Sequence, residues 1–126
     1  MPAKILAVVD DIFFLAKIQQ TARRLGVAVE AATPDALQDR VASDGPSAIL
    51  LDLNHHSGRS IEVLQSLKND PATRAIPVIS FLSHVQTDLA TAARAAGCDR
   101  VLARSAFSRQ LPQLLREWSR EENSDQ

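Results

Sequence analysis

The chain has 126 residues, a length that suits one compact domain and leaves too little for two. Hydrophobic residues make up 45% and charged residues 23% of it, a composition that excludes a disordered or fibrous protein. The net charge of -1 argues against direct binding of nucleic acid, because neutralising phosphates requires clustered Lys and Arg with a basic balance.

The chain carries no signature of a secreted or membrane protein. Cys98 is the single cysteine, so no internal disulfide can form. The first apolar stretch meets Asp10 too soon for a signal peptide, and no apolar run approaches the length that spans a membrane. We therefore expect a cytoplasmic protein without membrane association.

Five short runs rich in Val, Ile and Leu predict the strands of a sheet. They span residues 5–9, 27–32, 48–53, 77–82 and 101–103. Most of these runs are continuous rather than alternating, which is typical of parallel strands covered on both faces.

Apolar stripes with helical spacing follow each of these runs. The stripes are Leu15, Ile18, Ala22 and Leu25; Leu37 and Val41; Ile61, Leu64 and Leu67; Val85, Leu89, Ala92, Ala93 and Ala96; and Phe107, Leu111, Leu114, Leu115 and Trp118. Thr33, followed by Pro34, is a predicted N-cap, and Ser105 is another. Gly26 and Gly97 are predicted to end the first and fourth helices.

Strand and helix thus alternate five times, which predicts an α/β fold with a doubly wound parallel sheet and helices on both sides. One domain is expected over residues 1–120. The polar residues 121–126 are expected to form a disordered tail.

Acidic residues stand where two of the predicted strands end. Asp10 and Asp11 follow the first run, and Asp52 ends the third. In open α/β sheets, functional residues gather at the carboxyl ends of the strands. If the first and third strands are neighbours, three carboxylates converge, and a divalent cation would relieve their repulsion. Oxygen ligands favour Mg²⁺, whereas zinc prefers His or Cys.

Asp also occurs at strand ends simply because it caps helices. An adjacent pair together with a third Asp after a fully apolar run favours the functional interpretation.

Four segments, in this order, resemble the receiver domain of two-component response regulators, the CheY-like family. They are Lys4 to Asp11, Leu50 to Asn54, Ile76 to Ile79 and Ala95 to Asp99. The resemblance extends from Lys4 to about Glu117. It implies a flavodoxin-like fold with five helices around a five-stranded sheet in the order 2-1-3-4-5.

The resemblance also implies a role for each acidic residue. Asp52 would accept a phosphoryl group from a histidine kinase or a phosphotransfer protein. The side chains of Asp11 and Asp52 and the backbone carbonyl of Asn54 would hold Mg²⁺, with Asp10 acting through a metal-bound water. Because no output domain follows the last predicted helix, we expect a stand-alone receiver, not an enzyme, that signals by binding a downstream protein.

Several positions depart from the family pattern. The switch hydroxyl expected at the end of the fourth strand falls on Leu82, which cannot donate a hydrogen bond. Ser83 could replace it only if the strand end shifted by one residue, and a role in the strand or the next helix cap suits Ser83 equally well. Arg104 stands in place of the family's lysine and keeps its charge with a different geometry. Val101 replaces the aromatic switch residue.

His55 and His56 replace the Met-Pro pair that the family usually has after its phosphoacceptor. Two histidines beside a metal site can add a ligand or a pH response. Adjacent loop residues usually point apart, however, so a solvated loop is the favoured interpretation.

The departures at Leu82, Val101 and Arg104 motivate a second hypothesis, a pseudo-receiver that binds proteins without a phosphorylation cycle. A dehalogenase-type phosphatase is disfavoured because its aspartates alternate after the first strand, whereas Asp10 and Asp11 are adjacent. Flavin binding is disfavoured because this chain has carboxylates where a phosphate-binding loop needs donors.

Overall fold

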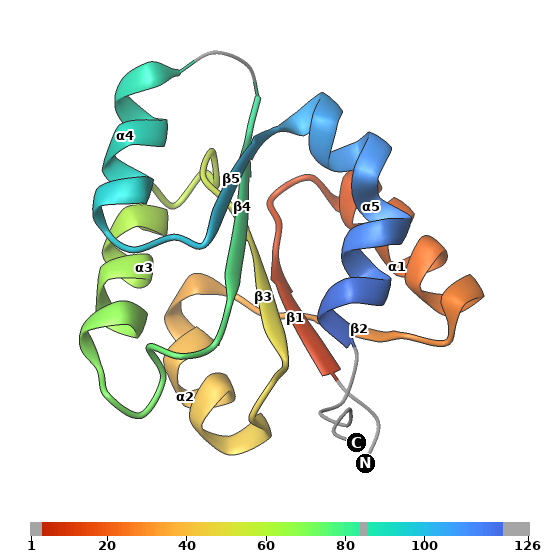
Figure 1. Ribbon diagram of the computed structural model, residues 1–126, viewed down its shortest axis with the longest axis horizontal. Helices are drawn as coiled ribbons and strands as arrows, with labels where there is room; N and C mark the ends of the chain where they lie inside the picture. Colours follow the sequence, from red (N-terminus) through yellow and green to blue (C-terminus); the bar gives the residue numbers. More distant parts are fainter. Residues whose placement is uncertain (1–3, 84–85, 120–126) are drawn as a thin grey trace.

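The computed structural model describes residues 4–83 and 86–119, in which strands and helices alternate (Figure 1). The strands are β1 (Lys4–Val8), β2 (Ala28–Ala31), β3 (Ala48–Asp52), β4 (Val78–Leu82) and β5 (Arg100–Ala103). The helices are α1 (Ile12–Leu25), α2 (Pro34–Asp44), α3 (Ser60–Asn69), α4 (Thr87–Ala95) and α5 (Arg104–Ser119). Val85, at the start of the fourth predicted stripe, and the predicted tail 121–126 lie outside the described residues.

The strands form one parallel sheet in the order β2-β1-β3-β4-β5, which confirms the predicted topology. α1 and α5 cover one face of the sheet, and α2, α3 and α4 cover the other (Figure 1). β3 and β4 are buried along their whole length, whereas the edge strands β2 and β5 are partly exposed. Within the described part of the chain, no helix is long and apolar enough to cross a membrane.

Two apolar cores lie on opposite sides of the sheet, because successive side chains of a strand point to opposite faces. In β1, Ile5 and Ala7 belong to the core beneath α1 and α5. Leu6 and Val8 belong to the core beneath α2, α3 and α4. Burial on both faces explains why this strand reads as a continuous apolar run rather than an alternating one.

Three of the four predicted caps, Thr33, Gly26 and Gly97, lie at helix boundaries. The Thr33 side chain accepts an N–H from the first turn of α2, and Gly26 ends α1 at a φ of 72° that favours glycine. Gly97, at a φ of 99°, follows the end of α4. The predicted Ser105 N-cap is wrong. α5 begins at Arg104, directly after β5, so no loop is left for a cap and Ser105 lies inside the first turn.

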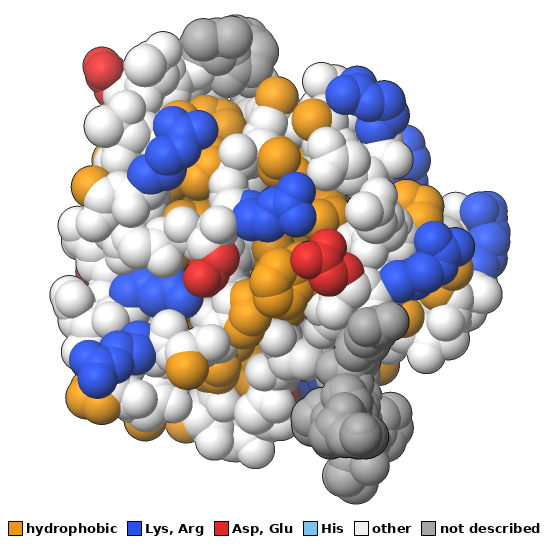
Figure 2. All heavy atoms as spheres, viewed as in Figure 1, with side chains coloured by type: hydrophobic (Ala, Val, Ile, Leu, Met, Phe, Trp, Pro, Cys, Tyr) orange, Lys and Arg blue, Asp and Glu red, His pale blue; other side chains and the backbone are white. Residues whose placement is uncertain are grey.

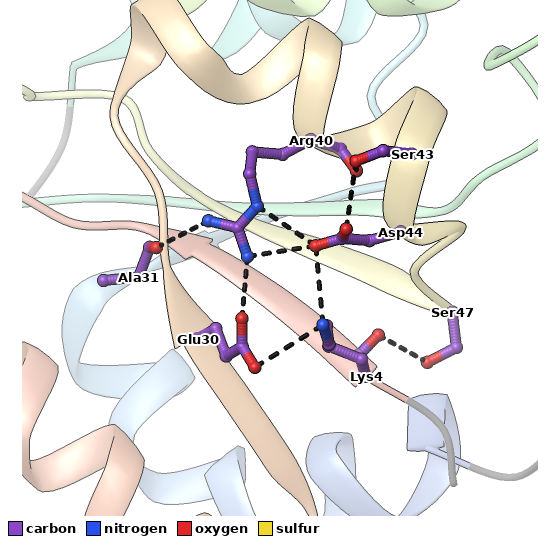
Figure 3. A network of polar contacts seen from close by, with 7 residues as sticks. All are labelled: Lys4, Glu30, Ala31, Arg40, Ser43, Asp44 and Ser47. Carbon is purple, nitrogen blue, oxygen red and sulfur yellow. Dashed lines mark hydrogen bonds and ion pairs between the residues drawn. The ribbon is translucent and has the colours of Figure 1, made fainter. Parts of the chain in front are cut away.

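An ion-pair network ties the start of β1 to the edge strand β2 and to α2 (Figure 3). Arg40 Nη2 lies 2.7 Å from Glu30 Oε1 and 3.0 Å from Asp44 Oδ2. Lys4 Nζ contacts the same two carboxylates at 3.5 and 3.4 Å. Because Lys4 begins β1, the network lies at the opposite end of that strand from Asp10, and its role is to hold the edge strand.

Phe107 anchors the core beneath α1 and α5, where its ring packs 4.6 Å from that of Phe81 and 5.9 Å from that of Phe14. Phe107 is 0% exposed, so we expect Phe107→Ala to lower the free energy of unfolding by about 3–5 kcal/mol. Phe13, with 80% of its surface exposed, offers a matched control, and Phe13→Ala should change stability by no more than about 0.5 kcal/mol. Urea unfolding of both variants measures the difference, and equal losses would contradict this description of the core.

Candidate functional site

The pairing of β1 with β3 brings the acidic segments together. The parallel register sets Val8 opposite Leu51, so Asp10 and Asp52 follow at the same edge of the sheet. The backbone N–H of Asp10 donates a hydrogen bond to Asp52 Oδ2 at 3.1 Å. The carboxyl ends of the first and third strands are therefore neighbours, as expected.

The Asp52 carboxylate is buried and held by backbone donors. Only 3% of the residue is exposed. Its Oδ1 accepts a hydrogen bond from the backbone N–H of Asn54 at 2.9 Å, and its backbone carbonyl accepts one from the buried hydroxyl of Ser60 at 2.6 Å. These bonds fix the carboxylate, and each of its oxygens retains lone-pair capacity for a further partner.

Asp11 caps α1 and pairs with a cation at the same time. Its Oδ1 accepts the backbone N–H groups of Phe13 at 2.8 Å and Phe14 at 3.2 Å, and its Oδ2 lies 3.0 Å from Arg104 Nη2. These backbone hydrogen bonds, followed by the Arg104 guanidinium, lower the pKa of Asp11 below its ordinary value. The structure thus brings Arg104 into the acidic cluster from the start of α5.

Asp10 is paired with a histidine from the loop after β3. His56 Nδ1 lies 2.5 Å from Asp10 Oδ1, and the backbone N–H of His56 donates to Asp10 Oδ2 at 3.2 Å. The side-chain contact with His56 is the main reason that the pKa of Asp10 lies below its ordinary value of 3.8. Sequence reasoning missed this contact, because nothing in the order of residues indicates which side of the loop His56 occupies.

The two histidines do not point apart, and that expectation is wrong. The rings of His55 and His56 stack with centroids 4.7 Å apart and an interplanar angle of 24°. The loop turns tightly at this point, because the N–H of Gly58 bonds to the His55 carbonyl and Gly58 takes a φ of 70° that favours glycine. This turn allows the side chains of His55 and His56 to point in the same direction.

Asn54 links the acidic cluster to the end of β4. Its Oδ1 accepts the backbone N–H of Ser83 at 2.7 Å, and its Nδ2 donates to Gln86 Oε1 at 2.7 Å. Leu82 is only 4% exposed and belongs to the core beneath α2, α3 and α4. The end of β4 therefore meets the site through the backbone of Ser83, while Leu82 fills the core.

A groove of about 830 Å³ opens beside the site, between α4, β5 and the start of α5. Its lining includes Leu82, Val101, Phe14, Arg94 and Arg104. Figure 2 shows the face of the molecule that carries these elements, with apolar side chains exposed between Lys and Arg side chains. The small side chain at Val101 contributes to the open space.

The contact between His56 and Asp10 predicts that the pKa of Asp10 will change when His56 is replaced. In the folded protein the pKa of Asp10 is lowered, so ionised Asp10 stabilises the fold above its ordinary value of 3.8, and this stabilisation is lost as the pH falls through the lowered pKa. His56→Ala should raise the pKa of Asp10 toward its ordinary value. His55→Ala is the matched control and should raise the pKa less, because His55 acts only through its charge. An NMR titration of the Asp10 carboxyl carbon measures both, and an unchanged pKa in His56→Ala would rule out the pairing.

No protein-family model matches the chain, and no curated protein matches it either. Solved structures match it over nearly its whole length. A CheY-like response regulator receiver domain protein from Methanospirillum hungatei JF-1 shares 19% identity at a TM-score of 0.81, and 100% of each chain is covered. The Mn²⁺-bound form of response regulator Rcp1 shares 20% identity at a TM-score of 0.78, covering 95% of this chain and 96% of that one.

The phosphorylated cyanobacterial phytochrome response regulator RcpA shares 25% identity at a TM-score of 0.72, covering 93% of this chain and 91% of that one. In strand order, in helix placement and over almost all of its length, the chain has the fold of a response regulator receiver domain.

Proposed function

We propose that the chain is the receiver of a phosphorelay, with Asp52 as the phosphoacceptor. The observation that carries this proposal is the buried Asp52 carboxylate at the end of β3, held by N–H groups of Asp10 and Asn54. The donor is a phosphohistidine on a histidine kinase or a phosphotransfer protein. Transfer forms a P–O bond to Asp52 and breaks the P–N bond, and the imidazole keeps the electron pair. The output is binding to a downstream protein in the cytoplasm.

Mg²⁺ is the cation that we propose for this site. The donors are all oxygens, from the side chains of Asp11 and Asp52, the backbone carbonyl of Asn54, and Asp10 through water, and this set fits a hard divalent ion. The side chains of Asp10 and Asp11 are 35% and 43% exposed, so an ion can enter from solvent. A bound ion neutralises the charge that develops on the transferring phosphoryl group. The Mn²⁺-bound form of a neighbour with the same fold supports a divalent ion in such a chain.

We assign the contact with the phosphoryl group to Arg104. Its guanidinium carbon lies 4.1 Å from the centre of the Phe14 ring, and one of its nitrogens bonds to Asp11. Stacking on an aromatic face holds the planar group in place and leaves further N–H groups to bind phosphoryl oxygens. A structural neighbour, RcpA, is phosphorylated, which supports phosphorylation of a chain with this fold.

The signal has to leave the site by a route that does not use Leu82 or Val101. Leu82 offers no donor, and Val101 carries no aromatic ring to turn. β4 ends at Leu82, so the strand end has not shifted and Ser83 does not take the switch position within the strand. Ser83 remains a candidate because it is exposed directly after β4 and its backbone N–H bonds to Asn54. A partner would then bind the groove between α4, β5 and α5, where a shift of Ser83 changes the lining.

One observation favours the second candidate function, a pseudo-receiver that binds proteins without a phosphorylation cycle. Asp10 and Asp11 each already contact a cationic group of the chain itself, His56 when protonated and Arg104. Such pairs relieve the repulsion within the acidic cluster without any metal ion. In that case the acidic cluster only stabilises the fold. The chain then neither binds Mg²⁺ nor accepts a phosphoryl group from a phosphodonor.

A phosphodonor experiment separates the two functions. Wild-type protein incubated with Mg²⁺ and a small phosphodonor should gain one phosphoryl group by intact mass spectrometry, and Asp52→Asn should gain none. Asp39→Asn, an exposed carboxylate on α2, is the matched control and should be modified like the wild type. An unmodified wild type would support the pseudo-receiver, and modification of Asp52→Asn would place the acceptor elsewhere.

Thermal unfolding tests the cation site by itself. An ion that binds only the folded chain adds about 2.7 kcal/mol of stability at 100 times its dissociation constant, so Mg²⁺ should raise the melting temperature. Asp11→Asn should lose most of this increase. Because Asn also caps helices well, the variant without Mg²⁺ should stay close to the wild type in stability. A wild-type melting temperature that does not change when Mg²⁺ is added would argue against the site.

A further inference from the structure

A second group of ligand atoms lies beside the acidic cluster and shares only Asp10 with the Mg²⁺ site proposed for phosphotransfer. Asp10, His55 and His56 each offer one ligand atom, and these atoms all lie within 4.8 Å of one another. Asp10 follows β1, and both histidines come from the loop between β3 and α3. The pairing of β1 with β3 that places Asp10 beside Asp52 therefore also places it beside the two imidazoles.

The loop that carries the histidines is held by its own hydrogen bonds. The backbone N–H of His55 donates to the Asp52 carbonyl at 3.2 Å, and that of His56 donates to Asp10 Oδ2 at 3.2 Å. The backbone N–H of Ser57 donates to His55 Nδ1 at 3.2 Å, and Ser57 Oγ lies 3.0 Å from the same nitrogen, so hydrogen bonds from outside the ligand set orient this imidazole. The loop thus places the two rings side by side without any bound ion.

The donor set of two imidazole nitrogens and one carboxylate oxygen differs from the oxygen set proposed for Mg²⁺. Imidazole suits borderline transition metals such as Zn²⁺ and Ni²⁺, and three protein ligands with an open fourth position are common in accessible zinc sites. We propose that Asp10, His55 and His56 bind a divalent transition-metal ion of the Zn²⁺ class. The imidazoles also line a cavity of about 570 Å³, which leaves room for a water molecule as the fourth ligand.

Metal binding requires only a small movement of exposed side chains. Asp10 Oδ1 and His56 Nδ1 are 2.5 Å apart, a separation bridged by a proton. A zinc ion with bonds of about 2.0–2.2 Å replaces this proton and opens the pair to roughly 3.3 Å, the spacing of two ligands around a tetrahedral ion. The displaced proton passes to solvent. The His56 side chain is 76% exposed, so it can rotate without disturbing the core.

Isothermal titration of the tag-free chain with Zn²⁺ alone tests the proposal. We expect one ion per chain, and we expect Asp10→Asn, His55→Ala and His56→Ala each to weaken binding at least ~10-fold. Asp39→Asn, which removes an exposed carboxylate on α2, is the matched carboxylate control and should bind Zn²⁺ like the wild type. Asp52→Asn should also keep Zn²⁺ binding while losing phosphorylation, so this result is independent of the proposed phosphotransfer.

The chain's third histidine, His84, falls outside the described residues, and His84→Ala is measured as a further control. Wild-type affinity in both His55→Ala and His56→Ala, or a loss of binding caused by His84→Ala alone, would overturn the proposal. So would an absence of Zn²⁺ binding to the wild type. Far-UV circular dichroism of each variant shows that a lost signal reflects a lost ligand and not a lost fold.

Discussion

Parallel pairing of β1 with β3 sets the backbone N–H of Asp10 3.1 Å from Asp52 Oδ2, and the candidate site is built around that hydrogen bond. A slip of one residue in this register would send the side chains of β1 to the wrong core. Ile5 and Leu6, on opposite faces of the sheet and fully buried, prevent the slip. Apolar packing through the middle of the sheet thus determines where the carboxylates at its edge can lie.

Charge balance gives the three carboxylates different roles. Backbone N–H groups hold the Asp52 carboxylate, whose oxygens keep lone pairs for a further partner. One oxygen of Asp11 accepts hydrogen bonds from the first turn of α1, and the other contacts Arg104. Asp10 faces both the oxygen cluster and the imidazole of His56. An ion in either proposed site therefore interacts with the Asp10 carboxylate, and the two sites compete for this residue. Competition of this kind would make the proposed phosphorylation of Asp52 depend on the concentration of transition metals.

The fold could be predicted because each element carries a strong local signal. The continuous run that became β3 and the Thr33 cap that begins α2 needed no tertiary information. The candidate site was predicted in outline, since Asp10 and Asp52 end neighbouring strands. The partner of Asp10 was not, because the turn at Gly58 decides where His56 points and the sequence gives no sign of that direction. Local signals identify strand ends, whereas contacts between loops depend on the packed structure.

Mn²⁺ added in an amide NMR experiment shows whether the strand ends form the cation site that we propose beside Asp52. A paramagnetic ion broadens the signals of nearby amides. We expect substoichiometric Mn²⁺ to broaden the amide signals of Asp10, Asp11 and Asn54 first, while the amide signal of Lys4, at the other end of β1, stays sharp. Uniformly sharp signals, or broadening that begins near Lys4, would rule out a cation site at these strand ends.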